Sequence, residues 1–336
     1  MARLDRAAFN PSKLPHDVVI GVALTPSIAA GLIIYKLVAL EMLGIAIAFG
    51  IAGELFARFA WRAHIPRPHA SPIIASLFGV ALVGAGAPLT TKIDGITVPG
   101  VAIAIALAAV VLELLRARYV PAVRAQAGLF AYALIALITR GAPFAYVNPA
   151  DGLLAADPIN SWWRYFTPDA AAVDPIKLYV GNVPGPVFAT SMLAVVVGIA
   201  WMAYARRLSL IVLASFLVGA LLPIQLFHWN LVFQLDSGPM WFVAGLILAD
   251  RRMLPDSWAI RPVIGIVAGV FAVGLRSRGY GIEAAFMTVA AMQAVAAVLV
   301  TIMWSFSVAR ERMRRTRRLR QREAQLRVVK TVSRAG

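Results

Sequence analysis

Ten long apolar stretches alternate with short polar connections along the chain. They lie at 17–36, 38–60, 71–89, 97–115, 123–142, 185–204, 208–227, 232–249, 260–275 and 281–306. A helix needs about 20 mostly apolar residues to cross a bilayer. The pattern therefore predicts an all-α integral membrane protein with about ten transmembrane helices.

The ten stretches fall into two groups of five. The first group occupies a membrane half over 17–142 and the second a half over 185–306, with the loop 143–184 between them. Because each half has an odd number of spans, the second half is expected to be inverted relative to the first, as in many transporters.

The third span of each half is interrupted near its start, by Ser71-Pro72 and by Ser237-Gly238-Pro239. Pro and Gly free backbone polar groups that lipid does not satisfy, so such breaks face protein or a water-filled cavity. Breaks at matching positions favour a central binding site. The alternative is a pair of kinked helices without a ligand.

Composition agrees with the apolar pattern. Hydrophobic residues make up 60% of the chain, charged residues 14%, and the mean hydropathy is +0.78. Soluble domains carry roughly 45–50% apolar and about 25% charged residues, so a soluble protein is excluded. The chain has no cysteine, which excludes thiolate-bound iron–sulfur clusters. Its four histidines form no pattern typical of a metal site.

The net charge of +16 predicts the orientation in the membrane. Ten spans with a cytoplasmic N-terminus, residues 1–16, place most of the 32 Lys and Arg residues on the cytoplasmic side. We expect a multi-pass protein of the inner or plasma membrane with both termini cytoplasmic and the loop 143–184 extracytoplasmic. The basic tail 307–336 is expected to contact anionic lipids rather than nucleic acid.

Five carboxylates fall within the predicted spans, and each needs a partner or a function there. Glu54 and Glu113 each have an arginine within four residues, which favours ion pairs at helix ends. Three others, Glu41, Asp236 and Glu283, lie toward the outer side and are candidates for ion binding or a proton relay. The alternative is simple pairing with Lys36, Arg276 and Arg278.

Several strings together resemble the RnfD/NqrB family of membrane subunits of ion-motive oxidoreductases. They are Gly181-Asn182-Val183-Pro184-Gly185, Ala189-Thr190-Ser191, His228 with Ser237-Gly238 and Ala249-Asp250, and Leu275-Arg276 with Gly279-Tyr280 and Glu283. The resemblance implies ten helices in two inverted halves and an electron-transport role with other membrane redox subunits.

Three departures from the family pattern change what the resemblance implies. The family attaches FMN to a threonine in an outer loop, and the matching position here is Asp157, which offers no hydroxyl for the phosphodiester. The family's FNPA string is replaced at 125–128, and Ala189 replaces its glutamate. We therefore expect no covalent FMN, and a flavin or quinone held without a covalent bond. The candidate cofactor-binding residues are Thr190, Ser191, Ser237, Gly238 and Arg276.

The segment 174–191 is similar to a divergent RnfD-like branch encoded in enediyne biosynthesis clusters. This likeness implies a redox accessory in natural-product biosynthesis, with turnover of a substrate left open. One alternative is a small-molecule permease or sensor on the same scaffold. A second is a membrane docking partner for pathway enzymes.

Overall fold

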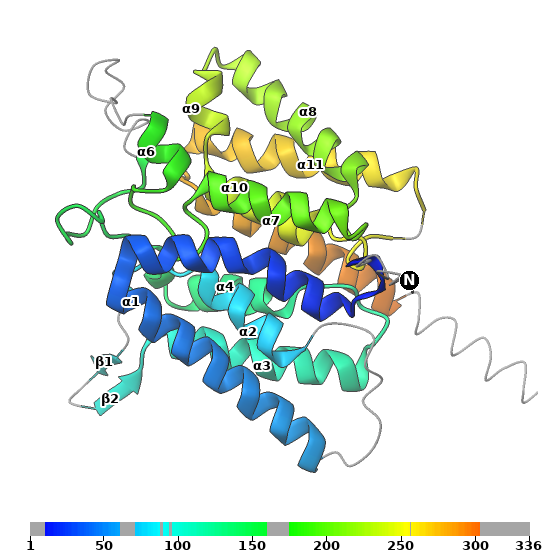
Figure 1. Cartoon of the computed structure of the whole chain (residues 1–336). Helices are drawn as coiled ribbons and strands as arrows, with labels where there is room; N and C mark the ends of the chain where they lie inside the picture. The colour runs from blue at the N-terminus through cyan, green and yellow to red at the C-terminus, as the bar shows by residue number, and fades with distance from the viewer. Residues whose placement is uncertain are drawn as a thin grey trace, which may run out of the picture.

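The computed structural model describes residues 11–60, 71–87, 90–93, 96–159, 175–255 and 257–302. The predicted tail 307–336, the start of the chain and the middle of the loop 143–184 lie outside the described residues. The described part is a bundle of apolar helices lying side by side (Figure 1).

A helix occurs in every one of the ten predicted stretches. The first half holds α1 (His16–Ala60), α2 (Pro72–Ala81), α3 (Val101–Tyr119) and α4 (Ala127–Ile138). The second half holds α7 (Met192–Tyr204), α8 (Leu210–Leu226), α9 (Leu231–Leu235), α10 (Gly238–Trp241), the π-helix Phe242–Leu248, α11 (Ile260–Gly274) and the helix Glu283–Ile302. Short helices at Pro11–Lys13, Ala142–Phe144, Pro175–Val180 (α6) and Leu275–Arg278 lie in the connections.

Among the described residues, three helices are long and apolar enough to cross a bilayer: His16–Phe59, Ile260–Arg278 and Glu283–Ile302. Five further apolar helices have 10–17 residues. Large apolar side chains such as Ile33, Leu137 and Leu226 are exposed on the outside of the bundle. Exposed apolar side chains on this scale suit contact with lipid rather than water. The chain is thus a multi-pass membrane protein, as its apolar pattern predicts.

The first two predicted spans form one continuous element, α1, that bends sharply at Lys36. Lys36 has φ 50° and ψ −118°, which is not a helical conformation. The two arms of α1 meet there at an angle (Figure 1). The bend lies at the predicted boundary between 17–36 and 38–60.

One connection of this otherwise helical bundle is a short hairpin. Strands β1 (Thr90–Ile93) and β2 (Ile96–Pro99) form an antiparallel hairpin in register Thr90↔Pro99. β-Branched residues dominate both strands, and Asp94-Gly95 stands between them in the sequence, a pair typical of hairpin turns. The predicted span 97–115 consequently starts later, at Val101.

The two predicted breaks are helix starts. Ser71 and Ser237 are the N-cap residues of α2 and α10, each followed within two positions by a proline. Proline is favoured in the first turn because its missing N–H has no partner there in any case. Both helices lead into the core, where the rings of Phe78 and Phe242 meet edge to face at 5.8 Å.

The chain beyond α2 joins the two halves. Residues 82–87 leave the helix, and the backbone of Val83 and Ala81 accepts hydrogen bonds from Val187 (2.9 Å) and Phe188 (3.2 Å). This pairing fixes the segment that leads into α7.

We call the end of the bundle that holds residues 141–159 and 178–191 the loop face. The opposite end, where α1 begins, is the terminal face.

Candidate functional site

The loop face brings together several residues that the sequence marks as candidates. Thr190, Asp236, Ser237 and Gly238 line one small cavity, together with Pro158, Ile159, Leu178, Val183, Pro184, Pro239 and Ile282. The start of α10 lies so close to the start of α7 that a Cβ on Gly238 would collide with the carbonyl of Thr190. The candidate residues Thr190 and Gly238 are therefore close together, at the starts of α7 and α10.

Two of the three hydroxyl groups here already have structural partners. Ser191 Oγ accepts a hydrogen bond from the backbone N–H of Ala194 at 3.3 Å and so caps α7. Thr190 Oγ1 donates to the carbonyl of Pro186 at 3.1 Å. The buried hydroxyl of Ser237 has no hydrogen-bond partner among the described residues.

These roles predict different costs for two matched substitutions. Ser191→Ala removes an N-cap and is expected to lower the free energy of unfolding by about 1 kcal/mol. Ser237→Ala removes a hydroxyl that makes no hydrogen bond to the described part of the chain, and it is expected to change the free energy of unfolding by less than about 0.5 kcal/mol. Thermal unfolding of both variants in one detergent measures the difference. Equal shifts would contradict the assignment of Ser191 as the cap.

The cavity between these residues is too small for a flavin or a quinone. Its volume is about 10 Å³, which is close to the minimum for one water molecule. Pockets for cofactors of that size are typically about 300–1,000 Å³. The loop-face cavity therefore does not accommodate the cofactor that the sequence suggests there.

Arg276, a further candidate from the sequence, is almost fully buried at 1% exposure. Its Nη1 donates to the carbonyl of Gln234 at 3.0 Å and to Gln234 Oε1 at 2.6 Å. The acidic groups that act on its charge are Asp157 and Glu283. The sequence singles out Arg276 and Glu283, and it marks Asp157 only as the position where the family's threonine is missing. No local pattern predicts that all three lie together.

The other two predicted acidic candidates lie apart from Arg276 in different ways. Asp236 follows α9 as its C-cap residue and lines the small cavity. Glu41 is exposed on the second arm of α1, and within the described ranges it makes no hydrogen bond or ion pair. The described contacts link Glu283 to Asp157 rather than to Glu41.

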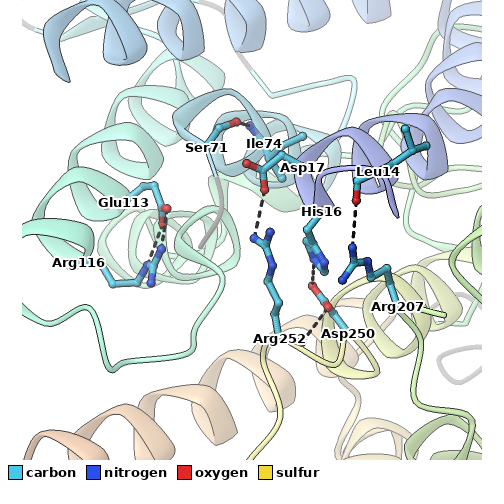
Figure 2. A network of polar contacts seen from close by, with 10 residues as sticks. All are labelled: Leu14, His16, Asp17, Ser71, Ile74, Glu113, Arg116, Arg207, Asp250 and Arg252. Atoms are coloured by element: carbon cyan, nitrogen blue, oxygen red, sulfur yellow. Dashed lines mark hydrogen bonds and ion pairs between the residues drawn. The ribbon is translucent and has the colours of Figure 1, made fainter. Parts of the chain in front are cut away.

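The terminal face carries a second polar cluster, which ties the start of α1 to the second half (Figure 2). His16 Nε2 and Asp250 Oδ2 are 2.9 Å apart, with both side chains 2% exposed. Asp250 Oδ1 accepts a hydrogen bond from the backbone N–H of Arg252 at 3.0 Å. Arg207 donates to the carbonyls of Ser12 (3.2 Å) and Leu14 (3.0 Å). The cluster was not foreseen, because 234 residues separate His16 from Asp250.

Two ion pairs lie near the terminal-face cluster (Figure 2). Arg252 contacts Asp17 at 3.2 Å. Burial lowers the pKa of Arg252, while the charges of Asp17 and Asp250 act in the opposite direction. Glu113 and Arg116 form a pair with two contacts, at 2.9 and 2.7 Å, which confirms the pair expected at that helix end.

A larger cavity of about 530 Å³ also opens near the terminal face. Its wall is mostly apolar, with Arg124 and Gln293 as the polar members. It is lined by Ala122, Arg124, Leu248, Met253, Leu254, Pro255, Ile260, Ile264, Met292, Gln293, Val295, Ala296, Ala297, Leu299 and Val300. Several of these side chains, including Val295 and Leu299, are exposed on the outside of the bundle. The cavity therefore has the size of a ligand pocket and an apolar side wall.

Comparison with known proteins gives one match over most of the chain. A model of the NQR2, RnfD, RnfE family matches residues 12–303. None of the curated proteins matches.

Proposed function

The chain belongs to the NQR2, RnfD, RnfE family of membrane subunits of ion-motive oxidoreductases, and from this premise we propose that it is a redox accessory working with other membrane redox subunits. The family match over residues 12–303 is the observation that carries the proposal. Membership in such a family supports a role in the bilayer beside electron carriers.

We propose further that no FMN is attached at the family's usual position. Asp157 stands there, 2% exposed, and its Oδ1 accepts a hydrogen bond from the N–H of Ile159 at 3.0 Å. A carboxylate supplies no hydroxyl for a phosphodiester, and burial leaves little access for a transferase.

A non-covalently bound cofactor fits the 530 Å³ cavity better than the small loop-face cavity. The cavity lies within the usual size range of ligand pockets. Apolar side chains of α11 and the helix 283–302 would hold a quinone or flavin ring, and Arg124 and Gln293 would orient its polar edge. Gln293 is itself held in place, because its Oε1 accepts a hydrogen bond from the N–H of Gln126 at 3.0 Å. A bound quinone or flavin would accept and pass on electrons.

Visible absorption of the detergent-purified protein, recorded before and after denaturation, tests this proposal. The sample comes from cells that also express a flavin transferase, and organic extracts are analysed for quinone. We expect a flavin that is released on denaturation, or a quinone in the extract at about one per chain. A flavin retained by the denatured chain would contradict the assignment of Asp157.

A pair of variants locates the cofactor. Ala296→Phe places a ring in the cavity wall, whereas Ala291→Phe adds the same ring to an exposed position of the same helix outside the lining. Only Ala296→Phe is expected to lose the cofactor. Equal cofactor content in the two variants would exclude this cavity as the site.

The topology is part of the same proposal. We propose two inverted membrane halves over 17–142 and 185–306, with the third span of each half starting at a Ser-Pro or Ser-Gly-Pro break. Both termini would be cytoplasmic and the protein would lie in the inner or plasma membrane, with the tail 307–336 in contact with anionic lipids.

The likeness over 174–191 supports a place in enediyne-type biosynthesis. A colourless protein without quinone would favour a permease or sensor, tested by flux in vesicles, or a docking partner, tested by deleting 308–336.

A further inference from the structure

An apolar groove lies between the last turns of α3 and the first turn of α4. Its lining comes from residues 112–119 of α3, the connection 120–125 and residues 127–130 of α4, and Arg116 and Tyr119 are its polar members. The volume is about 360 Å³, which lies within the usual range of ligand pockets. We call this space the α3–α4 groove.

The α3–α4 groove is separate from the 530 Å³ cavity. Val123 and Ala125 line the groove, whereas Ala122 and Arg124 line the cavity. Successive side chains of an extended segment point to opposite sides. The connection therefore divides two spaces, and an occupant of the groove does not depend on a cofactor in the cavity.

The groove opens on the outside of the bundle. Its rim residues Leu115 and Tyr119 are 45% and 65% exposed, whereas Val123 in its floor is 8% exposed. Leu107 and Val111 precede Leu115 at intervals of four residues and are exposed as well. Residues four apart share one side of a helix, so this side of α3 is an apolar surface facing lipid. A chain from the bilayer thus reaches the groove without any opening of the protein.

The groove ends near the terminal face, where one of two neighbouring arginines has a counterion. Arg116 is paired with Glu113, next to Asp17 (Figure 2). Arg118 lies in the same last turn of α3 and is exposed. Within the described part of the chain, Arg118 makes no hydrogen bond or ion pair.

The charge and the apolar wall lie in the order that a phospholipid needs. Arg118 follows Leu115 by three residues and so lies one turn nearer the helix end, on the same side of α3. Tyr119 lies beside it, and tyrosine rings are enriched at the level of the lipid headgroups. An acyl chain in the groove would thus have its headgroup beside Arg118. A neutral occupant would leave that charge without a counterion.

We propose that the α3–α4 groove binds one acyl chain of an anionic phospholipid, whose phosphate pairs with Arg118. The chain would fill the space that side chains leave between α3 and α4. This site is distinct from the basic tail 307–336. It requires a bilayer around the protein and does not rest on the proposed redox role.

Native mass spectrometry of the full-length protein in detergent tests the site. The protein is titrated with dioleoylphosphatidylglycerol or with dioleoylphosphatidylethanolamine, which has the same chains and no net charge. We expect the first phosphatidylglycerol to bind about fivefold more tightly than the first phosphatidylethanolamine, the effect of about one basic residue near an anionic headgroup. Glycerol 3-phosphate, which has no acyl chains, should not displace the lipid.

Two pairs of variants assign the charge and the groove. Arg118→Gln should lose the preference for phosphatidylglycerol. Arg206→Gln should keep it, because Arg206 is an exposed arginine next to the terminal-face cluster whose side chain also makes no described bond. Leu115→Gln should weaken the binding of both lipids about fivefold, because it puts a polar group in the apolar wall. Leu107→Gln makes the same change on the same side of α3 outside the lining and should bind as the native chain does.

Three results would overturn the proposal. They are equal binding of the two lipids by the native chain, displacement of phosphatidylglycerol by glycerol 3-phosphate, and equal binding by both members of each variant pair. The first two are measured on the native chain and hold even if a variant fails to fold. A dimer that Leu115→Gln dissociates, without tight phosphatidylglycerol binding, would show that a second copy covers the groove and that the proposal is wrong.

Discussion

Asp250→Ala is expected to lower the free energy of unfolding by about 3–5 kcal/mol. Asp250 accepts two hydrogen bonds in a buried position, one from His16 Nε2 (2.9 Å) and one from the backbone N–H of Arg252 (3.0 Å). Removing the carboxylate leaves both donors buried without partners, and each such group costs about 1–3 kcal/mol. Thermal unfolding in detergent should show the loss.

Two further variants make the result specific. Asp250→Asn keeps one oxygen acceptor, which still serves one of the two donors, and should lose clearly less stability than Asp250→Ala. Glu41→Ala removes an exposed carboxylate and should stay within about 0.5 kcal/mol of the native protein. If Asp250→Ala unfolds at the same temperature as Glu41→Ala, the terminal-face cluster does not hold the start of α1 to the second half.

Gly269→Ala is expected to lower the free energy of unfolding by about 2–3 kcal/mol. Helices α8 and α11 cross with their backbones in contact, since a Cβ on Gly269 would collide with the carbonyl of Phe216 and stand 2.7 Å from the nitrogen of Ala220. A Cβ on Gly219 would likewise collide with the carbonyl of Ile266. Small residues permit this close approach in membrane proteins, and overpacking such a contact is destabilising.

Gly274→Ala is the matched control on the same helix. A Cβ there would lie 3.9 Å from Pro223 Cβ, an ordinary contact distance. Alanine also favours helix over glycine by up to about 1 kcal/mol, so the control should be neutral or slightly stabilising. The fraction of protein that stays monodisperse on size exclusion after heating compares the two variants. Equal monodisperse fractions for the two variants would show that pushing α8 and α11 apart at Gly269 does not lower the stability.

The local pattern of the chain was enough to predict most of the helices. Runs of apolar residues mark each helix, because the bilayer and the core both require apolar side chains and internally paired backbone groups. Ser71-Pro72 and Ser237-Gly238-Pro239 mark two helix starts, since caps and proline act within a single turn. The hairpin at 90–99 was missed because the last three residues of its second strand, 97–99, read as the beginning of the next span.

The sites depended on tertiary packing. Thr190 and Ser237 line the same cavity, yet the closeness of α7 and α10 leaves only about 10 Å³ between them. No residue type in the sequence predicts how close α7 and α10 lie. The 530 Å³ cavity is likewise formed by segments far apart in the sequence, around Arg124, Leu254 and Gln293.

By itself, then, the sequence determined that this protein lies in a membrane, which segments are helical and where two central helices begin. These features depend on composition and on neighbours within a few residues. Only the tertiary structure decided that His16 pairs with Asp250, and that Asp157 and Glu283 converge on Gly281 beside Arg276. Those groups come from segments many residues apart, and their charges find partners only when the helices pack.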